Sequence, residues 1–201
     1  YLDSRRRGAI DDLLRARCDR PAVFLCQCLP AVRRGGAVGG RGLDLGFGAG
    51  SLGSSCIDNG GSVNITGTNA TRYQGVDIGR DGGMGSITLS NASNLSSTGG
   101  AGRLQVGRDG GTGMLNVQSG SSVEAFFADV GRGAGSDGSV TLDGYGTRLT
   151  LSDAYGSFDP VVVPEPQGGV LTVGREDGGD GDISVTNGAS LNVINDSMAA
   201  P

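Results

Sequence analysis

The chain has 201 residues, of which 40 are glycine, with no tryptophan, no histidine and 4% aromatic side chains. All 16 basic residues are arginine, which excludes imidazole bases, histidine metal ligands and Schiff-base lysines. Glycine at one residue in five, without a strict three-residue period, excludes collagen. This composition indicates either low complexity or a longer repeat.

Charge and cysteine divide the chain into two parts. Residues 1–41 hold nine arginines and four aspartates, a balance of +5, whereas residues 42–201 hold seven arginines and 17 acids, a balance of −10. The acidic part argues against nucleic acid as a partner. The last 145 residues contain no cysteine, which excludes a disulfide scaffold there. The four cysteines are Cys18, Cys26, Cys28 and Cys56.

The first part, residues 1–41, is basic, contains cysteine and carries no repeat. Residues 9–18 predict a short helix. The apolar run at residues 21–32 has the length of a signal-peptide core and is too short to cross a bilayer as a helix. Arg33 and Arg34 follow where a small-residue cleavage site is expected. A degraded export signal, a disordered basic arm and a misassigned reading frame therefore all remain open.

From residue 42 onward, an internal repeat dominates the sequence. In each unit an anchoring glycine precedes an arginine, and a second glycine lies six or seven residues beyond the anchor. The anchors are Gly79, Gly107, Gly131 and Gly174, spaced by 28, 24 and 43 residues. Aliphatic residues follow the second glycine at the second and fourth positions: Ile87/Leu89, Leu115/Val117, Val140/Leu142 and Ile183/Val185. This period of two is typical of a strand with one buried face.

A unit of three short strands and three bends cannot bury its apolar face alone, but copies stacked on one another can. Equivalent strands then pair in parallel about 4.8 Å apart, and right-handed connections are preferred. Residues 42–201 therefore predict an all-β fold, a single-stranded right-handed parallel β-helix (β-solenoid) of about five coils. Four aliphatic residues are expected in one column of its core. They are Ile87, Leu115, Val140 and Ile183.

Two stretches depart from the regular unit. The first unit is irregular, with Leu43 and Leu45 as its first strand and Val63 and Ile65 as the signature of its second strand. Residues 152–169 contain three prolines, which argue against a strand in register. We therefore expect a loop insertion at 152–169 that projects from the fourth coil.

The stretches GTNATRYQGVDIGRDGGMGSITLSNAS and VLTVGREDGGDGDISVTNGASL resemble the repeat of autotransporter (type V secretion) passenger domains and PEP-CTERM-associated surface proteins. That repeat runs as apolar-x-Val-Gly, then Gly-x-Gly-x-Leu-x-Ile, then a turn with Asn or Gly. The resemblance covers about residues 42–195, with Tyr73 and Leu149 where tryptophan often stands. It implies a secreted, adhesin-like, non-catalytic stalk at the outer membrane or released from a bacterial cell surface.

The most regular polar feature is an arginine after each anchor. The candidate ligand-binding residues are Arg80, Arg108, Arg132 and Arg175. Stacked at strand spacing these charges repel, and Asp81, Asp109 and Glu176 beside them can offset the repulsion. Both a structural charge ladder and a site for a sulfated or carboxylated glycan fit this pattern.

A second hypothesis is a polysaccharide-degrading enzyme of the β-helix class, and a third is a carbohydrate-binding module. Asp77 and Asp129 occupy equivalent positions two coils apart, about 9–10 Å from each other at strand spacing. Carboxylates near that separation serve inverting glycosidases. Gln105 lies between them and no histidine or lysine assists, so two aspartates on an outward, solvated sheet face are the better interpretation. No catalytic residue is predicted.

No metal or cofactor is predicted either. Asp177, Asp180 and Asp182 approach a calcium-binding nonapeptide, but Asp182 falls one place early, which favours solvated turn acids. Matches to GxGxxG at residues 48–53 and 133–138 open no helix, as a dinucleotide site would require. The expected partners are a host or matrix surface, a glycan or neighbouring cells, without nucleic acid and without membrane insertion of this segment.

Overall fold

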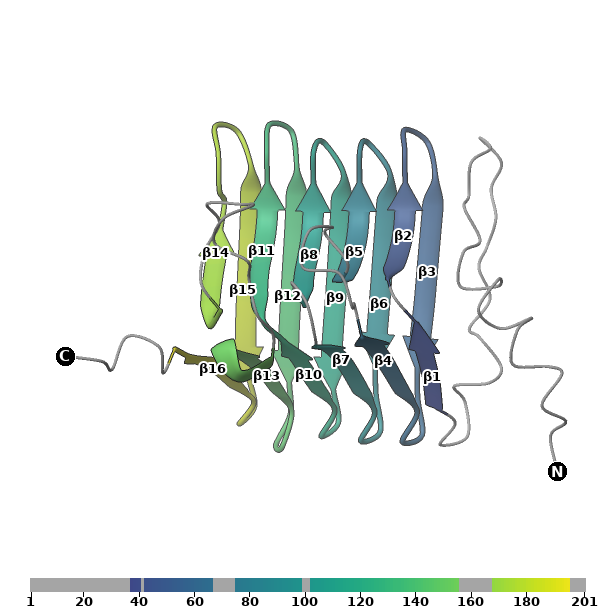
Figure 1. The fold of residues 1–201 in the computed structure, drawn as a ribbon, viewed down its shortest axis with the longest axis vertical. Helices are drawn as coiled ribbons and strands as arrows, with labels where there is room; N and C mark the ends of the chain where they lie inside the picture. The colour runs from purple at the N-terminus through teal and green to yellow at the C-terminus, as the bar shows by residue number, and fades with distance from the viewer. Residues whose placement is uncertain (1–36, 41, 67–74, 99–101, 156–167, 196–201) are drawn as a thin grey trace, which may run out of the picture.

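The computed structural model describes residues 37–40, 42–66, 75–98, 102–155 and 168–195 (Figure 1). Apart from one 3₁₀ helix, η3 (Asp153–Tyr155), the elements assigned in these ranges are β-strands. Strands of successive coils pair in parallel throughout. The predicted single-stranded parallel β-helix is therefore confirmed. Within these same ranges, no helix has the length and apolar character needed to span a membrane.

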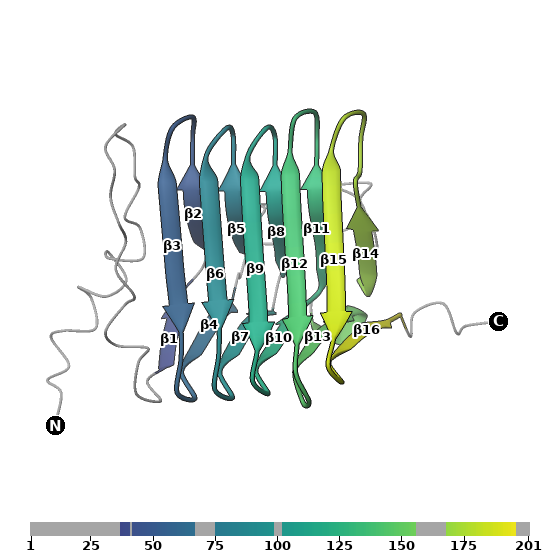
Figure 2. The ribbon, with the colours of Figure 1, turned by 180° about the vertical axis from the view of Figure 1, so that it is seen from behind.

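Each coil contributes one strand to each of three sheets, which we name A, B and C. Sheet A contains β1 (Ala37–Gly40), β4 (Ser62–Thr66), β7 (Asn94–Thr98), β10 (Ser122–Ala125), β13 (Arg148–Ser152) and β16 (Ser190–Ile194). Sheet B contains β2 (Leu43–Phe47), β5 (Gly75–Arg80), β8 (Arg103–Arg108), β11 (Phe127–Arg132) and β14 (Val170–Val173). Sheet C contains β3 (Leu52–Ile57), β6 (Met84–Leu89), β9 (Thr112–Gln118), β12 (Asp137–Asp143) and β15 (Asp180–Thr186). Figures 1 and 2 show sheets B and C one behind the other, with the strands of sheet A in a row along the bottom of the stack, from the first coil to the last.

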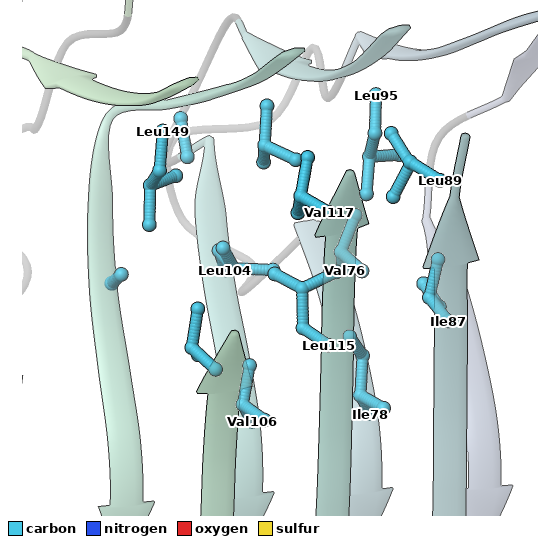
Figure 3. Packing of buried hydrophobic residues seen from close by; sticks show 14 of the residues in the cluster. Val76, Ile78, Ile87, Leu89, Leu95, Leu104, Val106, Leu115, Val117 and Leu149 are labelled. Carbon is cyan, nitrogen blue, oxygen red and sulfur yellow. The ribbon is translucent and has the colours of Figure 1, made fainter. Parts of the chain in front are cut away.

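Aliphatic columns fill the interior of the solenoid. Ile87, Leu115, Val140 and Ile183 lie in register on successive strands of sheet C, as predicted. The first three are completely buried, and Ile183 in the last coil is partly buried. Figure 3 shows side chains from several strands, among them Leu104 and Leu115, gathered in this interior. Full burial of an aliphatic side chain contributes about 1.5–3 kcal/mol, so these columns supply the main cohesion between coils.

The anchoring glycines lie at the edge where sheets B and C meet. At Gly79 the backbone φ is +70°, and a Cβ atom added there would overlap the carbonyl oxygen of Thr112 in the next coil. On the facing strand, a Cβ atom at Gly85 would overlap the backbone nitrogen of Gly79. Only glycine permits both this conformation and this approach of backbone to backbone. The regular spacing of the two glycines in the sequence therefore reflects a contact across the solenoid.

The structure corrects the prediction for the first coil. Val63 and Ile65 were expected in its second strand, but they lie in β4 of sheet A, which is the third strand. The second strand is β3, in which Ser55 pairs in register with the core residue Ile87. Because a serine stands where the other coils have an aliphatic residue, the alternation that marks this strand is weakened there.

Strand pairing also begins earlier than the predicted boundary at residue 42. Strand β1 pairs in parallel with β4, although it belongs to the segment expected to lack the repeat. Its sequence, AVGG, is too short to show a period of two. The predicted helix at residues 9–18 and the apolar run at 21–32 lie outside the described residues.

The predicted insertion lies between β13 and β14, after the fourth coil. Its first residue, Ser152, still belongs to β13, and Asp153–Tyr155 form η3. Residues 156–167, which include the three prolines, lie outside the described ranges. Register resumes at Val170, which pairs with Phe127 of the previous coil.

We predict that Gly79→Ala lowers the free energy of unfolding by about 3 kcal/mol or more, because it adds a clash to an unfavourable φ. Gly60→Ala is the matched control, since Gly60 has a φ of +73° with open space around it. The control is expected to cost about 1–2 kcal/mol. Urea unfolding monitored by circular dichroism measures both values, and equal losses would contradict the proposed contact.

Candidate functional site

The outer side of sheet B carries a column of polar residues. Its members pair in register from the first coil to the fifth: Asp44, Asp77, Gln105, Asp129 and Thr172. They alternate with core residues along each strand, so they face away from the interior. Nevertheless, Asp77 is 3% exposed and Asp129 is 1% exposed. The prediction that these two aspartates lie on a solvated face is therefore wrong.

Arginine side chains lie against both buried aspartates. Arg103 Nη2 donates a hydrogen bond to Asp77 Oδ2 at 2.7 Å, and Arg80 Nη1 lies 3.5 Å from the same oxygen. Arg132 Nη1 lies 3.4 Å from Asp129 Oδ2. Each buried carboxylate thus has at least one guanidinium partner, as a buried charge requires.

Gln105 joins the polar column to the arginine that ends its own strand. Its Nε2 donates to Asp129 Oδ2 at 3.1 Å, and its Oε1 accepts a hydrogen bond from Arg108 Nη1 at 2.8 Å. The hydroxyl of Thr172 donates to the other oxygen of Asp129. A neutral amide between Asp77 and Asp129 separates two charges that would repel at strand spacing. The buried acids of the column are therefore held in two groups of contacts, one around Asp77 and one around Asp129.

The structure brings the four predicted arginines into one ladder along the edge of sheet B. Arg80, Arg108 and Arg132 end their strands and pair in register. Arg175 follows β14, and its carbonyl oxygen accepts a hydrogen bond from the Gly133 amide, as the carbonyl oxygens of the other three do from the preceding coil. In the first coil Phe47 takes this position, and the Arg80 guanidinium carbon lies 5.2 Å from the centre of its ring.

The acids that follow the ladder arginines offset their charge, as predicted. Arg80 Nε lies 3.3 Å from Asp81, Arg108 Nε lies 2.9 Å from Asp109, and Arg132 Nε lies 3.0 Å from Glu176. The ladder side chains are only partly exposed, between 14% for Arg132 and 33% for Arg175. Because their guanidinium groups are engaged on both sides, an anionic glycan would have to compete with these internal carboxylates.

Arg103 is the member of the network that sequence analysis did not identify. It is 1% exposed, and in the neighbouring coils Gly75 and Phe127 occupy its position. A Cβ atom at Gly75 would clash with Arg103, so the glycine makes room for the arginine. Burial lowers the pKa of the Arg103 guanidinium, while the Asp77 carboxylate raises it. Gly75, Arg103 and Phe127 share this register position, so the repeat gives no pattern there. The one available sequence signal was an arginine within an otherwise acidic region.

Asp44 closes the polar column at its first coil. It retains solvent exposure, but it stands in register with Asp77. Desolvation against the sheet, repulsion from Asp77 and a hydrogen bond with Asp77 together raise the pKa of Asp44 to about 6, against the opposing effect of Arg80 and Arg103. A proton is therefore held in the first coil at a pH where most aspartates are ionised.

The other sequence motifs do not converge on a site. Within the described ranges, no group of three or more His, Cys, Asp and Glu side chains is placed to hold a metal ion, and Asp177, Asp180 and Asp182 form no such group. Both GxGxxG stretches fall in the turns that join sheet B to sheet C and the strands that follow. Their glycines serve those turns, as at Gly48 with a φ of +89° and Gly133 with a φ of +91°.

No protein-family model, curated protein or solved structure matches this chain.

Removal of the Arg103 guanidinium should destabilise the fold, because the buried Asp77 carboxylate then lacks its closest positive charge. We expect Arg103→Met to lower the free energy of unfolding by about 3–5 kcal/mol, because a buried Asp77 loses its closest cation. Arg148→Met, on an exposed position of sheet A, is expected to change it by less than about 0.5 kcal/mol. Denaturant unfolding of both variants provides the comparison, and recovery in Arg103→Met/Asp77→Asn would assign the loss to this pair.

Asp44 predicts a pH dependence of stability with a defined sign. The folded state holds the Asp44 proton more tightly than the unfolded state, so the stability contributed by this group falls as pH rises from about 4 to 6. In Asp44→Asn this fall is absent. The variant should therefore gain stability relative to the parent chain between about pH 4 and pH 7, measured by urea unfolding at both values. Asp182→Asn serves as the control, and a difference that stays constant with pH would disprove the assignment.

Proposed function

We propose that this chain is a segment of an exported, non-catalytic, adhesive stalk on a bacterial cell surface. The observation that carries the proposal is the stack of coils itself, in which parallel ladders run in register from β1 to β16. Each coil is held by main-chain hydrogen bonds and by aliphatic columns on both sides. Such a stack resists bending and local opening, which is the property that a projecting rod needs.

The repeat pattern supports the exported location. Stretches of it resemble autotransporter passenger and PEP-CTERM-associated surface proteins, which display solenoids of this kind outside the cell. The acidic charge of residues 42–201, a balance of −10, favours solubility and lateral separation of neighbouring stalks. The partners of such a stalk would be a host or matrix surface, a glycan or a neighbouring cell.

The state of the aspartates favours a non-catalytic role over the polysaccharide-degrading alternative. A general acid or base must come within hydrogen-bonding distance of the bond that it cleaves. Asp77 and Asp129 are instead buried and are held by Arg103 and Arg132. The Asp77–Arg103 pair joins adjacent coils, and the Asp129–Arg132 pair lies within one strand, so both carboxylates are occupied by internal contacts.

The location is tested on intact cells. Antibodies raised against the purified chain should label unlysed cells of the source organism, and protease added outside the cells should remove the signal. An antibody against a cytoplasmic protein provides the control for cell integrity. Labelling that appears only after lysis would disprove the surface location.

A further inference from the structure

The outer face of sheet C is open and, in its first three coils, uncharged. Figure 2 shows β3, β6, β9, β12 and β15 side by side with no other strand in front of them. Strands β3, β6 and β9 contain no charged residue at all. We call the outward positions of these three strands the neutral face. It contrasts with the outer side of sheet B, where the polar column is buried under arginine.

An apolar strip crosses the neutral face. Leu52, Met84 and Met114 are 40%, 53% and 46% exposed. Leu52 pairs in register with Met84, and Met114 pairs with Ser86, which places Met114 diagonally next to Met84 on the adjoining strand. Three large apolar side chains aligned across three coils form a contact surface of the kind that marks interaction sites. The flexible thioethers of methionine adapt readily to a partner.

Neutral hydrogen-bonding groups flank this strip. Thr88 and Asn116 pair in register, and Ser86 lies between Thr88 and Met84 along β6. No side-chain hydrogen bond joins these three residues to the rest of the described chain. The hydroxyls at the turns are used differently, since Ser93 and Ser136 donate to backbone carbonyl oxygens of their own turns. Ser86, Thr88 and Asn116 therefore offer donors and acceptors that no other described residue engages.

Charge decides which partner suits this face. The last two strands of the same sheet carry the exposed acids Asp137, Asp180 and Asp182, and residues 42–201 have a balance of −10. A second copy of the chain or an acidic polymer would meet repulsion, and a basic partner would prefer the acidic strands. A neutral polymer with both apolar and hydroxyl surface matches the first three coils.

We propose that the neutral face binds a neutral polysaccharide. Sugar rings present apolar C–H faces to Leu52, Met84 and Met114, and their hydroxyls meet the Ser, Thr and Asn side chains beside them. The coils repeat about every 4.8 Å, which is close to the advance of one pyranose unit in an extended β-linked chain. A chain laid along the stack would thus place one ring on each coil. This inference rests on the proposed adhesive stalk and names its ligand class.

The test uses the full chain and cellohexaose, a neutral β-linked hexasaccharide, in isothermal titration calorimetry. We expect saturable binding that is unchanged when salt is raised, because no charge takes part. Met84→Asp and Met114→Asp should each weaken binding at least about ten-fold, equal to 1.4 kcal/mol. Thr150→Asp places the same charge on an outward position of sheet A and should leave binding unchanged. Thermal unfolding of all three variants establishes that they remain folded.

Four outcomes would overturn the proposal. The first two are the absence of any heat of binding with cellohexaose and a loss of affinity in Thr150→Asp equal to that in the methionine variants. The other two are salt-dependent binding of oligogalacturonate instead of cellohexaose, and a dimer of the chain that Met114→Asp abolishes. The last outcome would assign the face to a second copy of the chain. Labelling of intact cells does not depend on sugar binding. A negative result with cellohexaose would therefore reject the polysaccharide site and leave the stalk proposal standing. Labelling that appears only after lysis, together with normal binding of cellohexaose, would reject the stalk proposal alone.

Discussion

The contact between glycine backbones at the edge of sheets B and C is the constraint on which the rest of this fold depends. Gly79 and Gly85 face each other there without side chains, and the same pair recurs in every later coil, as at Gly107 and Gly113. This approach lets the strands of sheets B and C meet closely at the edge beside the aliphatic columns. The glycine that would weaken an isolated strand is therefore what allows the coils to close.

Electrostatics serve the same cohesion on the outer side of sheet B. Identical acids stacked at strand spacing would repel each other. In this column Gln105 lies between Asp77 and Asp129, and each of the two aspartates is paired with an arginine. Interactions between these buried charges are strong because little water screens them. A buried ion pair adds less net stability than its attraction suggests, since both groups lose hydration. The Asp77–Arg103 pair favours one register, because a shift of either coil would leave the Asp77 carboxylate without the Arg103 guanidinium.

The repeat was enough to predict the stacking, because the aliphatic alternation and the glycine spacing are local signals that each coil carries. The same reasoning failed for β3, where Ser55 occupies a core column and hides the period. It also placed Asp77 and Asp129 in solvent, since a period of two tells which side of a strand a residue faces and not what covers that side. Arg103 was missed because its column is shared with a glycine and a phenylalanine, so its partner is set by packing between coils.

The three sheets end up with different surfaces although they share one repeat. On sheet B the polar groups form internal pairs, whereas on sheet C the side chains of Ser86, Thr88 and Asn116 have no hydrogen-bond partner within the described part of the chain. A coil needs its inward residues and its glycines for stacking, so the outward positions of sheet C are free to vary without loss of the fold. A face that stacking does not use is suited to recognition, which is why the neutral face of sheet C is the surface that we propose to bind a polysaccharide.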